Sequence, residues 1–288
     1  SEEAESIMET EYRSIVGKAM YLVTKLFVEG ANPVRELSKF FTNPGIEHWK
    51  ALEKFVGYLK KNEEDIRLTY RKPKVSGMVS SVDSNYATDK ETRRSVSGNL
   101  HTMGGMITSW LCNTQSNVTL SVTEAEYQSM SKGLQEVRFS QMLIEEIGNV
   151  FYQAVIFEDN TGAIFLVKNQ QVGARTKHID VRHHFIREHH EKKNFAVKYV
   201  KSEKNESDIL TKNTIEKILT AHALNIRDGT VMAWMDYQGA IETVAAAWKE
   251  NVVRDESDES WIEVCRRPVR LKSSLRNNPK YWNNERCD

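Results

Sequence analysis

The order in which short β-like and helix-like runs alternate most constrains the fold of this chain. From Leu68, β-like runs come first, and they are followed by a long helix, a strand, further helices, a strand and a short helix. This alternation predicts three antiparallel strands first and then an α/β sheet with helices on its faces. The strand candidates read RLTYRK, GMVSSVD, RSVSGNLHTM, GMITSWL, FYQAVIFED and FAVKYV. FYQAVIFED is mostly apolar, so we expect it to be buried on both faces.

The helices between the strands have clear limits. Ser121-Val122-Thr123-Glu124 fits a capping box and opens a helix to about Ile147, which Gly148-Asn149 ends. A second helix is expected from Asn160 to about Lys168. Two more are expected in HIDVRHHFIREHHEKK and NESDILTK.

The two ends of the chain have a different character. Residues 1–67 are predicted to be helical, with a turn at Asn43-Pro44-Gly45. Residues 214–288 begin helix-prone and continue with an acidic cluster, DESDES, and a basic one, RRPVRLKSSLR, which is typical of a solvated tail. We therefore divide the chain into a helical segment 1–67, an α/β domain 68–213 and an unassigned tail 214–288.

Composition excludes several classes of protein. Three cysteines without Cys-x-x-Cys spacing argue against a disulfide scaffold or a zinc finger and favour an intracellular chain. No apolar run approaches the roughly 20 residues of a membrane span, and the acidic start, SEEAESIMETEY, does not resemble a signal peptide. The first residue is not Met, so the chain is open to being a piece of a longer polypeptide.

Four acidic residues occupy positions that suggest chemistry. Asp83 and Asp159 end strands, Glu126 lies early in the long helix, and Asp208 lies near the start of the last helix. They can converge if the first and fourth strands of the sheet are neighbours. Carboxylates gathered in this way can hold two Mg²⁺ ions about 3.5–4 Å apart, an arrangement that hydrolyses phosphodiesters. Because the chain has 40 acidic residues, each of the four taken singly is more often a solvated charge.

The sequence motifs around these residues resemble those of a known family. In chain order they read VDSNYATDKETRRSVSG, SVTEAEY, FEDNTGAI, RTKHIDVRHHFIRE and ESDILTK. Together they are similar to the ribonuclease H domain of copia-type retrotransposon polyproteins. Upstream, YRSIVGKAMYL and LSKFFTNPGIEHWKALEKFVGYLK resemble the end of the reverse transcriptase and its connection to that domain. The resemblance covers roughly Tyr12 to Lys212.

The resemblance implies a ribonuclease H-like fold: a mixed five-stranded sheet flanked by helices, preceded by a helical reverse-transcriptase connection and followed by a poorly defined tail. It implies an enzyme that hydrolyses the RNA strand of RNA–DNA hybrids during reverse transcription. The family's catalytic and metal-binding acids fall on Asp83, Glu126, Asp159 and Asp208. The cofactor is then two Mg²⁺ ions, with Mn²⁺ as the alternative. Glu124 becomes a capping acid, and we expect Glu158 to point to the opposite face of its strand.

The resemblance also implies partners and a location. The partners are an RNA–DNA hybrid and the polymerase part of the same polyprotein, with no membrane involved. The location is cytoplasmic, in virus-like particles, with nuclear entry left open. The chain lacks the Asp-Asp strand turn of a polymerase palm, so it cannot polymerise by itself.

Charge and polar side chains agree with a nucleic-acid partner. Between residues 70 and 213 there are 19 Lys and Arg against 16 Asp and Glu, and without the four proposed ligands the balance is 19 against 12, or +7. Polar neighbours of the ligands can contact the hybrid or serve only as turn and cap residues; these are Ser84, Asn85, Thr123 and Asn160. The candidate phosphate contacts are Arg175, Lys177, His178 and Arg182.

Other interpretations remain open. His178, His183, His184, His189 and His190 invite a zinc hypothesis, although a basic amphipathic helix with a packed apolar side is favoured. The chain can also be a catalytically silent, domesticated nucleic-acid-binding or assembly protein. A third alternative is a fragment that exposes Trp49, Phe55 and Leu59 in the absence of its polymerase. An integrase or transposase core shares the metal arrangement, but the TEAEY and ILTK motifs favour ribonuclease H.

Overall fold

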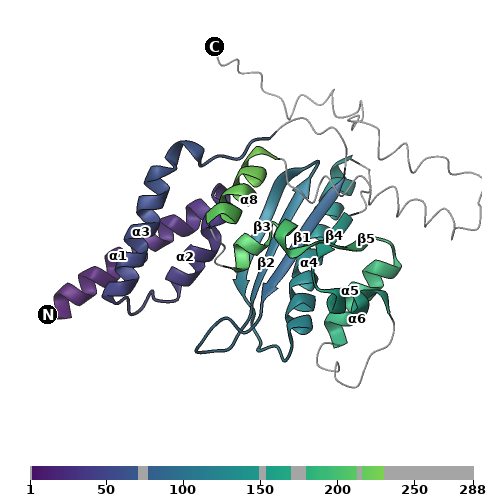
Figure 1. Ribbon diagram of the computed structural model, residues 1–288, viewed down its shortest axis with the longest axis horizontal. Coiled ribbons are helices and arrows are strands. Elements are labelled where there is room, and N and C mark those ends of the chain that lie inside the picture. Colours follow the sequence, from purple (N-terminus) through teal and green to yellow (C-terminus); the bar gives the residue numbers. More distant parts are fainter. Residues whose placement is uncertain (1, 71–76, 149–153, 170–179, 213–215, 230–288) are drawn as a thin grey trace, which may run out of the picture.

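A mixed β-sheet forms the centre of the molecule, with helices on both of its faces (Figure 1). The computed structural model describes residues 2–70, 77–148, 154–169, 180–212 and 216–229. Figure 1 shows α1, α2 and α3 gathered beside the sheet on the side of β3, with α5 and α6 on the opposite side. Among the described residues, no helix combines the length and apolarity needed to span a membrane.

The sheet has five strands in the order β3-β2-β1-β4-β5. The first three are antiparallel, and β4 and β5 continue the sheet in parallel. Gly104 and Gly105 join β2 to β3 with positive φ at both positions, which suits a tight hairpin turn. The predicted mixed five-stranded sheet flanked by helices is confirmed. The strands are β1 (Met78–Asn85), β2 (Val96–Met103), β3 (Met106–Thr114), β4 (Ala154–Glu158) and β5 (Phe195–Tyr199).

One strand prediction was wrong. Residues 67–70 of the β-like run RLTYRK belong to no strand, and the rest of the run lies outside the described residues. The backbone N–H of Thr69 donates to the carbonyl of Arg227, with the two atoms 2.7 Å apart. This part of the chain therefore meets a helix that is distant in sequence, a partner that a local β pattern does not contain.

Helices α4 (Val122–Gly148), α5 (Thr161–Lys168) and α6 (Asp180–Glu191) build a core with one face of the sheet. Tyr127, Met130 and Leu134 of α4 are fully buried in a cluster with Val82 of β1 and Ile156 of β4. All five residues of β4 are buried, as its apolar sequence predicted. Both limits predicted for the long helix agree with α4.

The predicted capping box opens α4. The backbone N–H of Glu124 donates to Ser121 Oγ at 3.1 Å, and Glu124 Oε2 accepts from the N–H of Leu120 at 2.7 Å. The helix N–H of Glu124 thereby gains an acceptor, while the Glu124 carboxylate holds the N–H of Leu120, one residue before Ser121. Glu124 serves as a capping acid, as predicted.

The other face of the sheet packs on the N-terminal helices and on the last two helices. Phe27 and Leu52 share one buried cluster with Val79, Val155 and Leu210. The indole N–H of Trp110 in β3 donates to the carbonyl of Val23 at 2.8 Å. These elements are α1 (Glu2–Lys25), the 3-10 turn η1 (Val28–Gly30), α2 (Ala31–Ser38), α3 (Ile46–Lys61), α7 (Asp208–Thr211) and α8 (Glu216–Asp228).

This packing bears on the fragment hypothesis. Phe55 is buried, and Trp49 and Leu59 pack against the same cluster, so the predicted exposure of the three side chains is not observed. Within the tail, α8 confirms a helix in the helix-prone stretch. Arg227 of α8 forms a buried ion pair with Glu29 of η1. The acidic and basic clusters of the tail lie outside the described residues, and the three-segment division of the chain stays a prediction.

Candidate metal centre

The candidate site lies where β1 and β4 stop pairing. Their parallel register ends with Ser81 opposite Phe157, two residues before Asp83 and Asp159. Side chains from elsewhere satisfy the freed backbone: the Asn205 amide donates to the carbonyl of Val82 at 2.9 Å, and the Ser129 hydroxyl donates to that of Asp83 at 2.7 Å. The ends of neighbouring strands thus present carboxylates at one place, as the sequence predicted.

Two groups of acids in the described residues can each hold a cation. The first is Asp83, Asp159 and Asp208, and the second is Glu126, Glu158 and Asp159. In each group, one oxygen from every carboxylate lies within 4.8 Å of the others, and Asp159 belongs to both groups. The structure therefore brings the four predicted ligands together and adds Glu158. A donor set made only of carboxylate oxygens suits Mg²⁺ or Mn²⁺.

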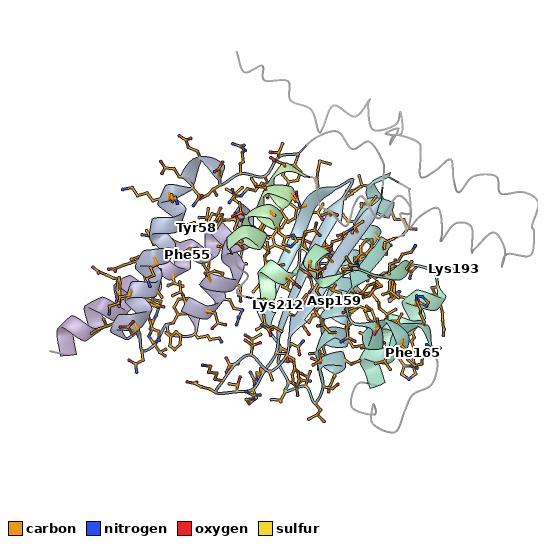
Figure 2. The ribbon with its side chains drawn as sticks, in the orientation of Figure 1. Phe55, Tyr58, Asp159, Phe165, Lys193 and Lys212 are labelled. Atoms are coloured by element: carbon orange, nitrogen blue, oxygen red, sulfur yellow. The ribbon has the colours of Figure 1, made fainter. Side chains whose placement is uncertain are left out.

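A lysine ammonium occupies one side of the cluster. Lys212 Nζ lies 3.0 Å from Asp83 Oδ1 and 2.9 Å from Asp208 Oδ1, and the Thr211 hydroxyl donates to Asp83 Oδ2. Figure 2 shows Lys212 and Asp159 in the middle of the molecule, between the α3 side chains Phe55 and Tyr58 and Phe165 of α5. Asp83, which is fully buried, thus has a partner for each oxygen.

Burial and mutual repulsion disfavour the charged forms of these carboxylates. Burial raises the pKa of Asp83, the Asp208 carboxylate raises it further, and Lys212 opposes both effects. Burial also raises the pKa of Glu126, and the Glu158, Asp83 and Asp159 carboxylates add to this increase. These directions mean that the cluster disfavours its full negative charge, which is the state that bound cations would favour.

The side chain of Glu158 points to the opposite face of β4, as expected, and there it meets another carboxylate. Strand alternation does turn its side chain away from the face of Phe157, which packs with α7. However, α4 covers the face that Glu158 reaches, and Glu126 comes from α4. The two carboxylates therefore meet in one group with Asp159, a neighbourhood that the family motifs alone did not indicate.

Two glycines let helices approach the site closely. Gly98 of β2 lies opposite Asp83, and a Cβ there would come within 2.6 Å of Thr211 Cγ2. On the other face, a Cβ on Gly133 of α4 would lie 2.7 Å from Val82 Cγ1. The absence of these two methyl groups permits the spacing of α7 and α4 on either side of β1.

The predicted nucleic-acid contacts have mixed outcomes. Asn160 caps α5, accepting from the N–H of Ala163 at 3.0 Å, and the Asn85 amide donates to the carbonyl of Thr211 at 3.1 Å. Ser84 is buried beside the cluster, and Thr123 lies against Gly162. Arg182 lies in α6, but its side chain, like Arg175, Lys177 and His178, is outside the described residues. Their contact with nucleic acid stays a prediction.

The zinc hypothesis gains no support from the described histidines. His189 stacks edge-on against Phe185 and shares a hydrogen bond with Asn194, and His190 packs on Phe195. The metal-capable groups found among the described residues consist of acids alone. His178 and the side chain of His183 lie outside those residues.

Sequence reasoning missed Lys212 and Glu158, although both left a signal. Lys212 follows Asp208 by four residues, the spacing at which opposite charges meet on a helix. Glu158 and Glu126 could have been linked by asking which helix covers the α4 face of β4. That question needs the sheet order and the helix positions together, which no single motif provides.

Two retrovirus-related Pol polyproteins from plant transposons are similar to the chain in sequence. It is 34% identical over 212 residues, 73% of its length, to the retrovirus-related Pol polyprotein from transposon TNT 1-94 of Nicotiana tabacum. It is 32% identical over 205 residues, 70% of its length, to that from transposon RE2 of Arabidopsis thaliana. The chain corresponds to a region of the copia-type Pol polyproteins. It spans only 16% and 14% of these two relatives. No family model matches.

A shorter relative and solved structures complete the comparison. The chain is 36% identical over 125 residues to secreted RxLR effector protein 161 of Plasmopara viticola, of which it covers 87%. LC11-RNase H1, solved in complex with an RNA/DNA hybrid, is 15% identical with a TM-score of 0.37, over 49% of this chain and 99% of that one. The observed sheet, with its order β3-β2-β1-β4-β5 and helices on both faces, is the mixed five-stranded sheet that the family resemblance predicted.

Proposed function

We propose that this chain is a metal-dependent endonuclease that hydrolyses the RNA strand of RNA–DNA hybrids during retrotransposon reverse transcription. The observation that carries the proposal is the convergence of two metal-capable groups of carboxylates that share Asp159. Such an arrangement suits phosphodiester hydrolysis, for which two closely spaced divalent cations are a recurring solution. The family supports a nucleic-acid substrate rather than another phosphate ester.

Each ligand has a role in this proposal. Asp83, Glu126, Asp159 and Asp208 would hold the two Mg²⁺ ions, and Asp159 would contribute to both. When bound, Mg²⁺ stabilises developing negative charge at the phosphate and lowers the pKa of an attacking water. Thr211 orients the Asp83 carboxylate by its hydrogen bond, and the backbone contacts of Ser129 and Asn205 hold the end of β1 in place.

Exposed cations near the site support a polyanionic substrate. Lys201 is exposed and adjoins Ser202, whose hydroxyl donates to Asp159 Oδ2. The loop between β1 and β2 presents Lys90, Arg93 and Arg94 to solvent, shortly after Asp83 in the chain. These side chains can contact phosphates on either side of the cut, while 2′-hydroxyl contacts would distinguish the RNA strand.

The wider setting of the activity is part of the proposal. The polymerase part of the same polyprotein would synthesise the DNA strand of the hybrid that this chain degrades. The work would take place in cytoplasmic virus-like particles. Mn²⁺ is the alternative cofactor, because it accepts the same oxygen ligands.

The test is cleavage of a hybrid with its RNA strand labelled, in Mg²⁺, by the full chain. We expect cutting of RNA that chelation of the metal abolishes. Asp83→Asn and Asp159→Asn should lower the rate by more than the roughly 10–100-fold typical of outer-shell partners of a metal site. Glu136→Gln, an exposed substitution on α4 with the same change in charge, is the matched control.

A second candidate function is favoured by one observation. The chain covers 87% of a relative that is named as a secreted effector, which is compatible with a catalytically silent, domesticated nucleic-acid-binding or assembly protein. In that case, folded protein would bind the hybrid without cutting it in Mg²⁺ or Mn²⁺. Binding unchanged by Asp159→Asn, with no cleavage, would reject the nuclease in favour of this function.

A further inference from the structure

We propose that Glu158 is a fifth carboxylate ligand of the metal centre, and that it holds one cation on the α4 side together with Glu126 and Asp159. The proposal rests on the nuclease function above and goes beyond the four acids expected from the family. On the α7 side, Asp83, Asp159 and Asp208 would hold the other cation.

The first support is the direction in which the Glu158 carboxylate is held. Glu158 is fully buried at the end of β4, and its Oε1 accepts from the backbone N–H of Asn160 at 3.0 Å. The side chain of Asn160 is itself fixed as the cap of α5. One oxygen of Glu158 is therefore anchored by a rigid turn, and this leaves the other as a ligand atom.

The second support is a pair of buried oxygens without partners. Glu158 Oε2 and Glu126 Oε2 have no hydrogen bond to any described residue. Both belong to carboxylates of the same metal-capable group. Buried polar atoms nearly always have a partner, so two unpartnered oxygens in one acidic group indicate a ligand that both would share.

The third support is the difference between the two sides of the cluster. Lys212 pairs with Asp83 and Asp208 on the α7 side. In the described part of the chain, no Lys, Arg or His forms an ion pair with Glu126 or Glu158 on the α4 side. Buried charges are ordinarily paired or coordinate metals. The α4 side is therefore where the protein provides carboxylates but no cation of its own.

The test uses Mn²⁺ as the probe, because its EPR signal reports how many ions remain free. Titration of the full chain should show two bound Mn²⁺. Glu158→Gln should bind one Mn²⁺ with unchanged affinity and the other with an affinity at least about tenfold lower. Glu136→Gln should retain both with unchanged affinity. Without metal, Glu158→Gln should melt at or above the temperature of the wild type, since it removes an uncompensated buried carboxylate.

The outcomes separate this proposal from the function on which it rests. Two Mn²⁺ bound with unchanged affinity by Glu158→Gln would overturn the Glu158 proposal and leave the nuclease intact. No bound Mn²⁺ in the wild type would overturn both. If Glu158→Gln does not fold, Glu158→Asp is the second variant, because it keeps the charge but withdraws it by one methylene. It should also lower the affinity for one of the two Mn²⁺ ions. Wild-type affinity for both ions in that variant would contradict the proposal.

Discussion

At the scale of single residues, the pairing of Lys212 with two of the proposed metal ligands has the most direct consequence. Its ammonium occupies oxygens of Asp83 and Asp208 that a divalent cation would need. A covalently attached cation of this kind stabilises the metal-free protein and competes with metal for the same carboxylates. Stability without metal and affinity for metal should therefore respond to Lys212 in opposite directions.

Lys212→Gln tests this competition. Without metal, we expect the variant to lose about 1–3 kcal/mol of unfolding free energy, because a buried carboxylate loses its charged partner. Added Mg²⁺ should then raise its melting temperature by more than it raises that of the wild type. Thermal melts with and without Mg²⁺ measure both effects, with Lys201→Gln as an exposed control. A smaller Mg²⁺-induced rise in Lys212→Gln would instead mean that Lys212 helps to hold the metal.

His101 predicts a pH dependence that is independent of the candidate metal centre. It is buried in β2, neither ring nitrogen has a hydrogen-bond partner among the described residues, and burial lowers its pKa to about 4. Unfolded His has a pKa of about 6.5. Between these values the unfolded chain binds the extra proton. The contribution of neutral His101 is therefore complete above about pH 6.5 and is lost as the pH falls towards 4.

The measurement is urea unfolding at several pH values between 4 and 7. Across this range, the contribution of His101 should raise the free energy of unfolding by about 3 kcal/mol at most as the pH increases. His101→Leu should remove this part of the pH dependence, whereas His184→Leu, at an exposed position, should keep it. An unchanged pH dependence in His101→Leu would assign the effect to other groups.

At the scale of elements, α8 is the part of the tail that the fold uses. Its Ala223 and Ile226 are buried, and Arg227 reaches Glu29 in η1 across nearly the whole described chain. The guanidinium also lies 6.0 Å from the centre of the Phe27 ring. The helix therefore connects residues beyond the α/β domain to the N-terminal helices.

Arg227→Met should be strongly destabilising, because it leaves the Glu29 carboxylate buried without its partner. We expect a loss of about 3–5 kcal/mol in the free energy of unfolding, measured in urea. Glu29→Leu combined with Arg227→Met should recover most of it, since neither charge then remains buried. An equal loss in the double variant would attribute the effect to packing of the arginine stem alone.

The elements also show which predictions depend on local information. The start of α4 was predictable because Ser121 and Glu124 form its cap within four residues. The run RLTYRK was predicted wrongly because the partner of Thr69 lies on α8. At the site, Asp83 and Asp159 were found from their places at strand ends and from the family motifs. Glu158 was set aside because its surroundings depend on α4, which covers one face of β4.

At the scale of the whole molecule, one buried cluster extends from the N-terminal helices to the sheet. It contains Phe27 and Leu52 as well as Val155 and Leu210, which belong to the layers around the site. Helices that share a core with a sheet are expected to unfold together with it. The geometry of the candidate metal centre should therefore depend on packing at a distance from any of its carboxylates.

Leu52→Ala in α3 examines this coupling. Leu52 is 1% exposed, so the cavity should cost about 2–5 kcal/mol. Far-UV circular dichroism and tryptophan fluorescence should follow a single, coincident transition at lower denaturant. Ile46→Ala, at an exposed position of the same helix, should leave the midpoint nearly unchanged. Two separate transitions in Leu52→Ala would mean that the helical layer unfolds by itself.

Gly98 and Gly133 set how closely α7 and α4 approach the strands next to the candidate metal centre. One faces α7 and the other lies in α4, so β1 is held between helices whose approach is limited by hydrogen atoms instead of side chains. Neither glycine carries a functional group or needs to touch a substrate. Even so, a methyl group at either position would push a helix or strand away from the candidate metal centre. The tolerances of the centre are thus set by two residues that contribute no chemistry to it.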